Sequence, residues 1–187
     1  VTGAGTIGLL ATLALRLRGL DVTTVARSQA PTRNSQLIER LGARYVSTTQ
    51  NDLPALADRD GRFDIVFEGS GAPALIEPAI STLAPNGVAA LFSVTPGSHP
   101  IPVDMARLNQ SLVLYNRVIV GSAAAARDDY ARAVATIGRA QANEATRGWL
   151  DELLTDRIEG FEAEAIARYL AGAGDDIKTT VEIGPGT

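Results

Sequence analysis

The chain opens with the stretch Val1-Thr2-Gly3-Ala4-Gly5-Thr6-Ile7-Gly8, which has the G-x-G-x-x-G spacing of a phosphate-binding loop. In this motif the first glycine permits a tight turn after a strand. The second lets the backbone approach a pyrophosphate, and the third lets the next helix pack closely on the sheet. The N-terminus of that helix offers N–H groups and the positive end of its dipole to phosphates. A glycine-rich strand–turn–helix without a ligand has the same pattern, so the surrounding sequence must decide.

The residues that follow favour the dinucleotide site. Residues 7–17 form an almost purely apolar run, as in a buried first helix, and the strand-like segment Val22-Thr23-Thr24-Val25 comes next. Only two residues precede the first glycine, so we expect a first strand shortened to two residues. We therefore expect the chain to be the C-terminal part of something longer.

Strand and helix patterns alternate through most of the chain. We expect strands at 21–26, 45–46, 63–68, 87–94, 113–121 and 178–183, and helices at 33–41, 53–57, 72–83, 128–139 and 162–170. This alternation predicts an α/β fold, a Rossmann doubly wound parallel sheet with helices on both faces, followed by a short C-terminal α/β extension. We expect 1–187 to form a single dinucleotide-binding domain, with its core ending at about residue 139 and the extension covering about 140–187.

Composition excludes several classes of function. The 187 residues carry a net charge of −4, and no cluster of basic residues suggests a nucleic-acid surface. With no cysteine there is no disulfide, no thiolate nucleophile and no cysteine-ligated zinc. The apolar run near the start is too short for a membrane span and lacks the basic region of a signal peptide. We expect a cytoplasmic protein.

The choice between NAD and NADP depends on the residues after the second expected strand. An acidic residue there binds the ribose 2′-hydroxyl of NAD, whereas an arginine accommodates the 2′-phosphate of NADP. This chain has Ala26-Arg27-Ser28, with Arg33 slightly further on and no carboxylate to repel a phosphate. We expect NADP, with NAD remaining possible. The alternative interpretation of Arg27 is a solvated loop arginine.

Several stretches together resemble the medium-chain, zinc-dependent dehydrogenases, and within them the C-terminal region of the glucose 1-dehydrogenase branch. The resemblance covers nearly the whole chain in order. Its stretches are the phosphate loop, Phe63-Asp64-Ile65-Val66-Phe67-Glu68-Gly69-Ser70-Gly71, Pro85-Asn86-Gly87-Val88, Leu91-Phe92-Ser93, Pro102-Val103-Asp104, Asn116-Arg117-Val118-Ile119-Val120-Gly121-Ser122 and Asp176-Ile177-Lys178.

The resemblance implies a role in cofactor binding for several groups of residues. Within the loop that includes Gly3 and Gly8, the segment Ala4, Gly5, Thr6 and Ile7 would lie against the pyrophosphate. Ala26, Arg27 and Ser28 would surround the 2′-phosphate. Phe92, Ser93 and Val94, with Ser122, Ala123 and Ala124, would line the nicotinamide end. Lys178 would help to hold the cofactor, or it is a surface lysine on an edge strand.

The chain departs from that family in two ways. The family's catalytic zinc and its ligands lie in a domain that precedes this region, and the single histidine here, His99, cannot build a three-ligand zinc site. We read His99 as a loop residue and expect no metal ligands and no catalytic residues in this chain. The family often has an asparagine that contacts sugar hydroxyls where this chain has Gly121-Ser122-Ala123-Ala124, which leaves glucose itself open as the substrate.

Three functions remain to be compared. The first is the NADP-binding region of an oxidoreductase that acts on a sugar, polyol or alcohol, inactive without its zinc domain. The second is a short-chain reductase, which needs a tyrosine with a lysine four residues later, and none of the four tyrosines has one. The third is a stand-alone nucleotide-binding or sensing module, since Glu68 and Asp104 read as strand-end and loop residues. By resemblance, the strand at 113–121 is a candidate for contact with a second copy.

Overall fold

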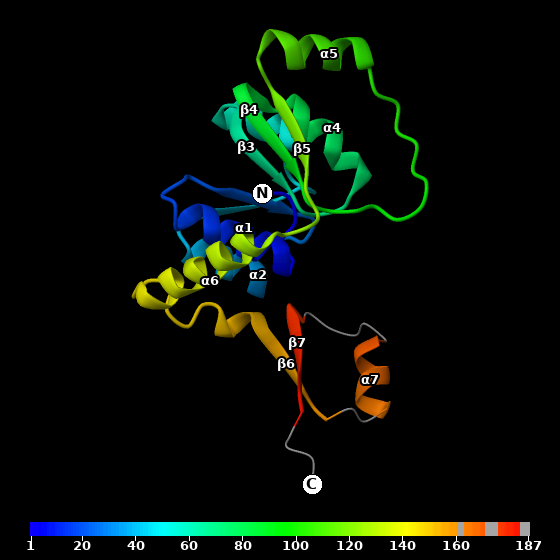
Figure 1. The fold of residues 1–187 in the computed structure, drawn as a ribbon. Helices are drawn as coiled ribbons and strands as arrows, with labels where there is room; N and C mark the ends of the chain where they lie inside the picture. Colours follow the sequence, from blue (N-terminus) through cyan, green and yellow to red (C-terminus); the bar gives the residue numbers. More distant parts are fainter. Residues whose placement is uncertain (161–162, 171–175, 184–187) are drawn as a thin grey trace. The chain divides into compact units, whose positions relative to one another are not determined.

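The computed structural model describes residues 1–160, 163–170 and 176–183, which fall into two compact units, Val1–Thr136 and Ile137–Thr187. The helices and strands are labelled in Figure 1. The strands are β1 (Thr23–Ala26), β2 (Arg44–Ser47), β3 (Phe63–Glu68), β4 (Leu83–Leu91), β5 (Val118–Gly121), β6 (Leu154–Glu159) and β7 (Lys178–Glu182). The helices are α1 (Thr6–Arg16), α2 (Arg33–Arg40), α3 (Leu53–Asp60), α4 (Pro73–Ser81), α5 (Met105–Leu114), α6 (Arg127–Ala142) and α7 (Ala163–Leu170), with a short 3₁₀ turn at Asp151–Leu153.

The first unit contains a parallel sheet in two parts that meet at Thr2. β1 pairs with β2, and β3, β4 and β5 pair in that order (Figure 1). Thr2 forms parallel bridges with both Val25 of β1 and Glu68 of β3. The resulting order is β2, β1, Thr2, β3, β4, β5, which reverses at Thr2 as in a doubly wound sheet. Thr2 therefore takes the place of a first strand, in agreement with the shortened strand expected from the sequence.

Helices cover both faces of this sheet. Thr24 of β1 hydrogen-bonds Thr12 of α1 at 2.7 Å between hydroxyl oxygens, whereas Val25 packs with Leu53 and Leu56 of α3. Successive strand residues point to opposite faces, so α1 and α3 lie on opposite sides of the sheet. A second core cluster contains Val66, Ala79, Ile80, Leu83 and Ala89, with Leu108 and Leu112 of α5 packed against it. The predicted doubly wound fold is confirmed.

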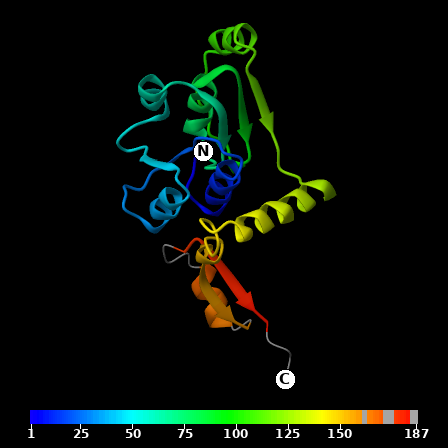
Figure 2. The same cartoon turned by 90° about the vertical axis from the view of Figure 1, so that its left-hand side faces the viewer.

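Two local expectations were wrong. The segment at 113–121 is not one strand, because Val113 and Leu114 end α5 and only Val118–Gly121 form β5 (Figure 2). The Asp104 side chain starts α5 by accepting a hydrogen bond from the Arg107 amide at 3.0 Å, and a short apolar run fits a helix end as well as a strand. The first helix is not buried all round, since Ile7 and Leu10 are exposed.

The second unit contains β6 and β7, which pair in parallel, and α7. β6 was not expected from the sequence, and β7 and α7 lie where a strand and a helix were expected. Glu162, the first residue of that expected helix, lies outside the described residues. No described helix has the length and hydropathy that crossing a bilayer requires.

Candidate cofactor site

The phosphate loop runs from the middle of the sheet into the N-terminus of α1. The Gly3 amide donates to the Val25 carbonyl at 2.8 Å, and Gly3 has a φ of +92°, a value that favours glycine. Gly5 is the N-cap residue of α1 and has no side chain to cap it. The helix N-terminus therefore begins without a side-chain acceptor in front of it, at the carboxyl end of the strands, where doubly wound sheets bind their ligands.

The second and third glycines of the loop differ in their surroundings. A Cβ placed on Gly8 would lie 1.9 Å from the Gly3 carbonyl oxygen, so only glycine lets α1 pack this closely against the turn. A Cβ placed on Gly5 would meet nothing within 4 Å. The loop therefore packs tightly on its inner side and stays open on its outer side. This geometry fits a pyrophosphate that approaches the backbone at Gly5.

Glu68, which we read from the sequence as a strand-end residue, organises the neighbouring loop. Its side chain is buried, and its Oε1 atom accepts hydrogen bonds from the Thr2 hydroxyl (3.2 Å), the Ser70 amide (2.9 Å) and hydroxyl, and the Gly71 amide (3.2 Å). The loop held in this way abuts the phosphate loop, because a Cβ on Gly3 would lie 3.2 Å from backbone atoms of Gly69 and Ser70. Glu68 thus stabilises the loop that packs against the phosphate loop, and this structural role accounts for its burial without a catalytic one.

We expect Glu68→Ala to lower the free energy of unfolding by about 3 kcal/mol, because four donors lose a charged, buried acceptor. Glu68→Gln, which retains an acceptor oxygen, should cost clearly less. Chemical denaturation of the two variants and the parent chain measures the difference. Equal stability of Glu68→Ala and the parent chain would contradict the supporting role of this carboxylate.

Ala26 is the last residue of β1, and Arg27 and Ser28 form a bend directly after it, as expected. Arg27 and Ser28 are exposed, and Arg33 is exposed at the first position of α2. No acidic residue occurs between Arg27 and Ile38. The turn therefore presents a cationic side chain to solvent without a nearby carboxylate in sequence.

Asn34 connects α2 to the phosphate loop, and sequence reasoning missed it. The nitrogen of its side-chain amide, Nδ2, donates to the Ala4 carbonyl oxygen at 2.6 Å. Asn34 can reach the loop because a reciprocal pair of hydrogen bonds between Thr32 and Ser35 fixes the start of α2. A Thr-x-x-Ser pattern predicts the start of the helix, but no sequence signal points to a contact with Ala4.

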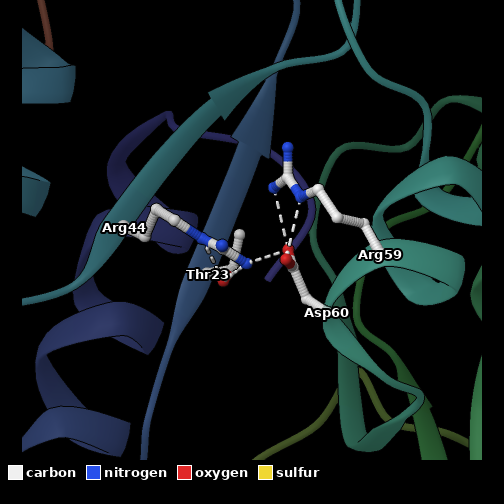
Figure 3. Close-up of polar contacts among 4 residues, drawn as sticks. All are labelled: Thr23, Arg44, Arg59 and Asp60. Atoms are coloured by element: carbon white, nitrogen blue, oxygen red, sulfur yellow. Dashed lines mark hydrogen bonds and ion pairs between the residues drawn. The ribbon is translucent and has the colours of Figure 1, made fainter.

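Two other arginines, Arg44 at the start of β2 and Arg59 near the end of α3, form a separate cluster. Figure 3 shows Arg44 and Arg59 on either side of Asp60, with Thr23 also bound by Arg44. Hydrogen bonds from Arg59 and Arg44 hold the pKa of the Asp60 carboxyl well below its usual range. Because Thr23 and Arg44 are the first residues of β1 and β2, this cluster is separate from the turn after β1.

The residues expected at the nicotinamide end lie after β4 and β5. The Phe92 amide donates to the Glu68 carbonyl at 2.9 Å, and its ring stacks on Phe67 with centroids 4.4 Å apart. The Ser122 amide donates to the Leu91 carbonyl at 3.0 Å. Ser93 is half-buried, and the remaining members of the set are exposed: Val94, Ser122, Ala123 and Ala124. The structure thus brings the ends of β3, β4 and β5 together, whereas the contact of these residues with a nicotinamide stays a prediction.

The remaining candidates have simpler surroundings. Lys178 lies on β7 in the second unit, where its amide donates to the Thr155 hydroxyl at 3.3 Å, and its cofactor role stays a prediction. His99 lies in a loop, with Nε2 3.1 Å from the Pro96 carbonyl oxygen. In the described part of the chain, no group of three or more His, Cys, Asp or Glu side chains is placed to hold a metal ion.

Comparison with known proteins assigns the family. A family model described as "Glucose dehydrogenase C-terminus" matches residues 1–183. The chain belongs to this family. Within the glucose dehydrogenase C-terminus family, it is 35% identical over 183 residues to Glucose 1-dehydrogenase 2 of Vulcanisaeta moutnovskia, covering 98% of this chain and 49% of the relative. It is also 35% identical over 187 residues to Glucose 1-dehydrogenase 1 of Caldivirga maquilingensis, covering 99% and 50%.

A solved structure agrees with this assignment to the glucose dehydrogenase C-terminus family. The glucose dehydrogenase of Haloferax mediterranei, in complex with NADP, Zn and gluconolactone, matches this chain with a TM-score of 0.83 and 26% identity. The match covers 99% of this chain and 50% of the other. The chain thus spans about half the length of the relatives it matches.

Proposed function

We propose that this chain binds NADP and is the cofactor-binding region of a medium-chain oxidoreductase that transfers a hydride between the nicotinamide and a sugar, polyol or alcohol. The observation that carries the proposal is the loop that is closely packed at Gly8 and open at Gly5, and whose Gly3 amide binds Val25 in the strand that leads to Arg27. Bound NADP would supply the hydride carrier. The relatives named above, including the one with NADP in its structure, support the cofactor and the substrate class.

This chain's own residues would bind and orient the cofactor. The amides at the start of α1 would bind the pyrophosphate, and Arg27 and Ser28 would bind the 2′-phosphate. Phe92 to Val94 and Ser122 to Ala124 would bound the nicotinamide end. The donor set does not fit zinc, because the sequence has no cysteine and a single histidine. We therefore place any zinc in the half of the relatives that this chain does not cover.

The exposed edge of the sheet supports a further part of the proposal, contact with a second copy. Val118, Ile119 and Val120 of β5 are 36–49% exposed, and β5 pairs only with β4 among the described strands. An apolar edge strand of this kind readily pairs with another chain.

The Arg27→Ala variant tests the choice of nucleotide. Only NADP has the 2′-phosphate, and a charge-assisted hydrogen bond contributes about 1.5–3 kcal/mol. Because Arg27 is exposed, we expect the lower end of this range, about a tenfold loss of NADP affinity, with NAD affinity nearly unchanged. Isothermal titration calorimetry with both nucleotides measures the two losses.

Arg18→Ala is the matched control, since it removes the same charge at the C-terminal end of α1, where the Arg18 guanidinium donates to the Ala14 carbonyl. It should leave both affinities unchanged. An equal loss for NADP and NAD in Arg27→Ala would reject the assignment of Arg27 to the 2′-phosphate.

A further inference from the structure

Residues of β2, and Thr48 directly after it, bind the carbonyls at the end of β1 and in the turn that follows. The Ala26 carbonyl accepts from the Thr48 amide at 2.8 Å, which continues the ladder between β1 and β2. Beyond the ladder, side chains replace the backbone as donors. The Ser47 hydroxyl donates to the Arg27 carbonyl at 2.9 Å, and the Tyr45 hydroxyl donates to the Ser28 carbonyl at 2.6 Å. Three successive carbonyls, the last of β1 and the first two of the turn, are therefore bound by residues of one neighbouring segment.

We infer that Tyr45 and Ser47 are positioning residues for nucleotide choice, which fix the backbone of the turn so that Arg27 and Ser28 face the 2′-phosphate. This inference rests on the proposed NADP site. It adds two residues of β2 that would not touch the cofactor and would act through the turn.

The Ser47 hydroxyl acts as a donor toward Arg27 and as an acceptor toward Thr49. A serine hydroxyl has one proton, and Ser47 gives it to the Arg27 carbonyl. The Thr49 hydroxyl, 2.8 Å away, must then donate to Ser47, and the Thr49 amide donates to the same oxygen at 3.3 Å. Ser47 is only 3% exposed, so water does not readily replace these partners. The acceptor at Arg27 is therefore held by a buried, fully engaged hydroxyl.

Tyr45 adds a second fixed point one residue further along the turn. Burial raises the pKa of its phenol above the usual value, so the hydroxyl remains a donor through the neutral pH range. The two donors come from positions i and i+2 of β2, which point to the same face of the sheet. Together they hold two adjacent peptide planes in a segment that has no helix or strand hydrogen bonds of its own.

Fixing the backbone should favour binding by Arg27. An arginine loses much conformational freedom when it binds a phosphate, and a fixed backbone lowers the part of that cost that comes from the turn. NAD lacks the 2′-phosphate and gains nothing from this ordering. Loss of the two donors should therefore weaken NADP more than NAD.

The test uses the double variant Tyr45→Phe/Ser47→Ala, with calorimetric affinities for NADP and NAD. We expect about a fivefold loss for NADP, from two neutral hydrogen bonds, and less than a twofold change for NAD. Tyr130→Phe is the matched control, because it removes the same hydroxyl from a tyrosine that is 66% exposed on α6. If the double variant fails to fold, Tyr45→Phe alone retains the ring and keeps the same readout.

Asn34→Ala provides the contrasting result. Because its amide binds the Ala4 carbonyl in the phosphate loop, its loss should weaken NADP and NAD alike. A double variant that behaves in this way, or that leaves both affinities unchanged, overturns the positioning role of Tyr45 and Ser47.

Combination with Arg27→Ala separates the inference from the function on which it rests. If Tyr45 and Ser47 act through Arg27, their effect on the NADP to NAD ratio should largely disappear in the Arg27→Ala background. An undiminished effect overturns the inference. If Arg27→Ala itself leaves the ratio unchanged, the proposed NADP site fails instead, whatever the β2 variants do.

Discussion

We expect Gly5→Val to reduce the affinity for NADP and NAD by at least a hundredfold while the fold is retained. A valine at Gly5 would occupy the space that is empty in the structure and from which a pyrophosphate would reach the backbone. Loss of two charge-assisted hydrogen bonds, each contributing about 1.5–3 kcal/mol, accounts for this factor. The backbone of Gly5, with φ −78° and ψ −172°, suits valine, so stability should fall only by about 1 kcal/mol from a poorer helix cap.

Gly8→Ala is the control that separates binding from folding. Its Cβ would clash with the Gly3 carbonyl, so α1 must move and the free energy of unfolding should fall by roughly 1–3 kcal/mol. Calorimetry with each nucleotide and chemical denaturation distinguish the two variants. Unchanged affinity in Gly5→Val would show that the pyrophosphate binds elsewhere.

The second large effect concerns turnover. We expect the 187-residue chain to bind NADP but to oxidise no sugar, polyol or alcohol, even with added zinc, because it offers a single histidine and no cysteine to a catalytic metal. A chimera should differ. The half of the Vulcanisaeta relative that this chain does not cover, joined before Val1, should give zinc-dependent NADPH formation with that enzyme's substrate.

Two controls make the chimera informative. The relative's own two halves, rejoined at the same point, must be active, and the chimera with Gly5→Val must be inactive. Calorimetric NADP binding by the chimera shows that its cofactor half is folded. A chimera that binds NADP without turnover would favour a stand-alone binding or sensing module. Turnover by the 187 residues alone would contradict the absence of catalytic residues.

Local patterns predicted the fold well, including the turn at Gly3 and the start of α1 after Gly5. The spacing of Gly3, Gly5 and Gly8 depends on backbone geometry within one turn, and Figure 1 shows α1 to β4 in the predicted order, whereas α5 and β6 were not predicted. The residues from Val113 were wrongly predicted to start a strand, because the apolar end of a helix and the start of a strand have the same pattern over a few residues. The strand at β6 was missed because its charged, largely exposed residues lack a strand pattern.

The parts of the site that depend on distant contacts could not be predicted. Glu68 has four donors, three of which belong to Ser70 and Gly71, within three residues of it, but its contact with Thr2 spans 66 positions. Asn34 reaches Ala4 across 30 positions, and Tyr45 reaches Ser28 across 17. The partners of Asn34 and Tyr45 are backbone carbonyls, which any residue type could supply, so neither side chain alone indicates its partner.

Thr2 gives binding a further thermodynamic role. Thr2 forms parallel bridges with Val25 of β1 and Glu68 of β3. On the β3 side its amide donates to the Phe67 carbonyl at 2.8 Å and its carbonyl accepts from the Gly69 amide at 3.0 Å, while on the β1 side the flanking Val1 carbonyl and Gly3 amide bind Val25. This junction at Thr2, here called the seam, is followed directly by Gly3 and the loop proposed to hold the pyrophosphate. Opening of the seam and release of the nucleotide are therefore linked equilibria, and a nucleotide at a hundred times its dissociation constant would stabilise the closed seam by about 2.7 kcal/mol. Bound cofactor would thus hold the two parts of the sheet together. The Thr2 amide should then exchange its hydrogen more slowly with the nucleotide bound than without it.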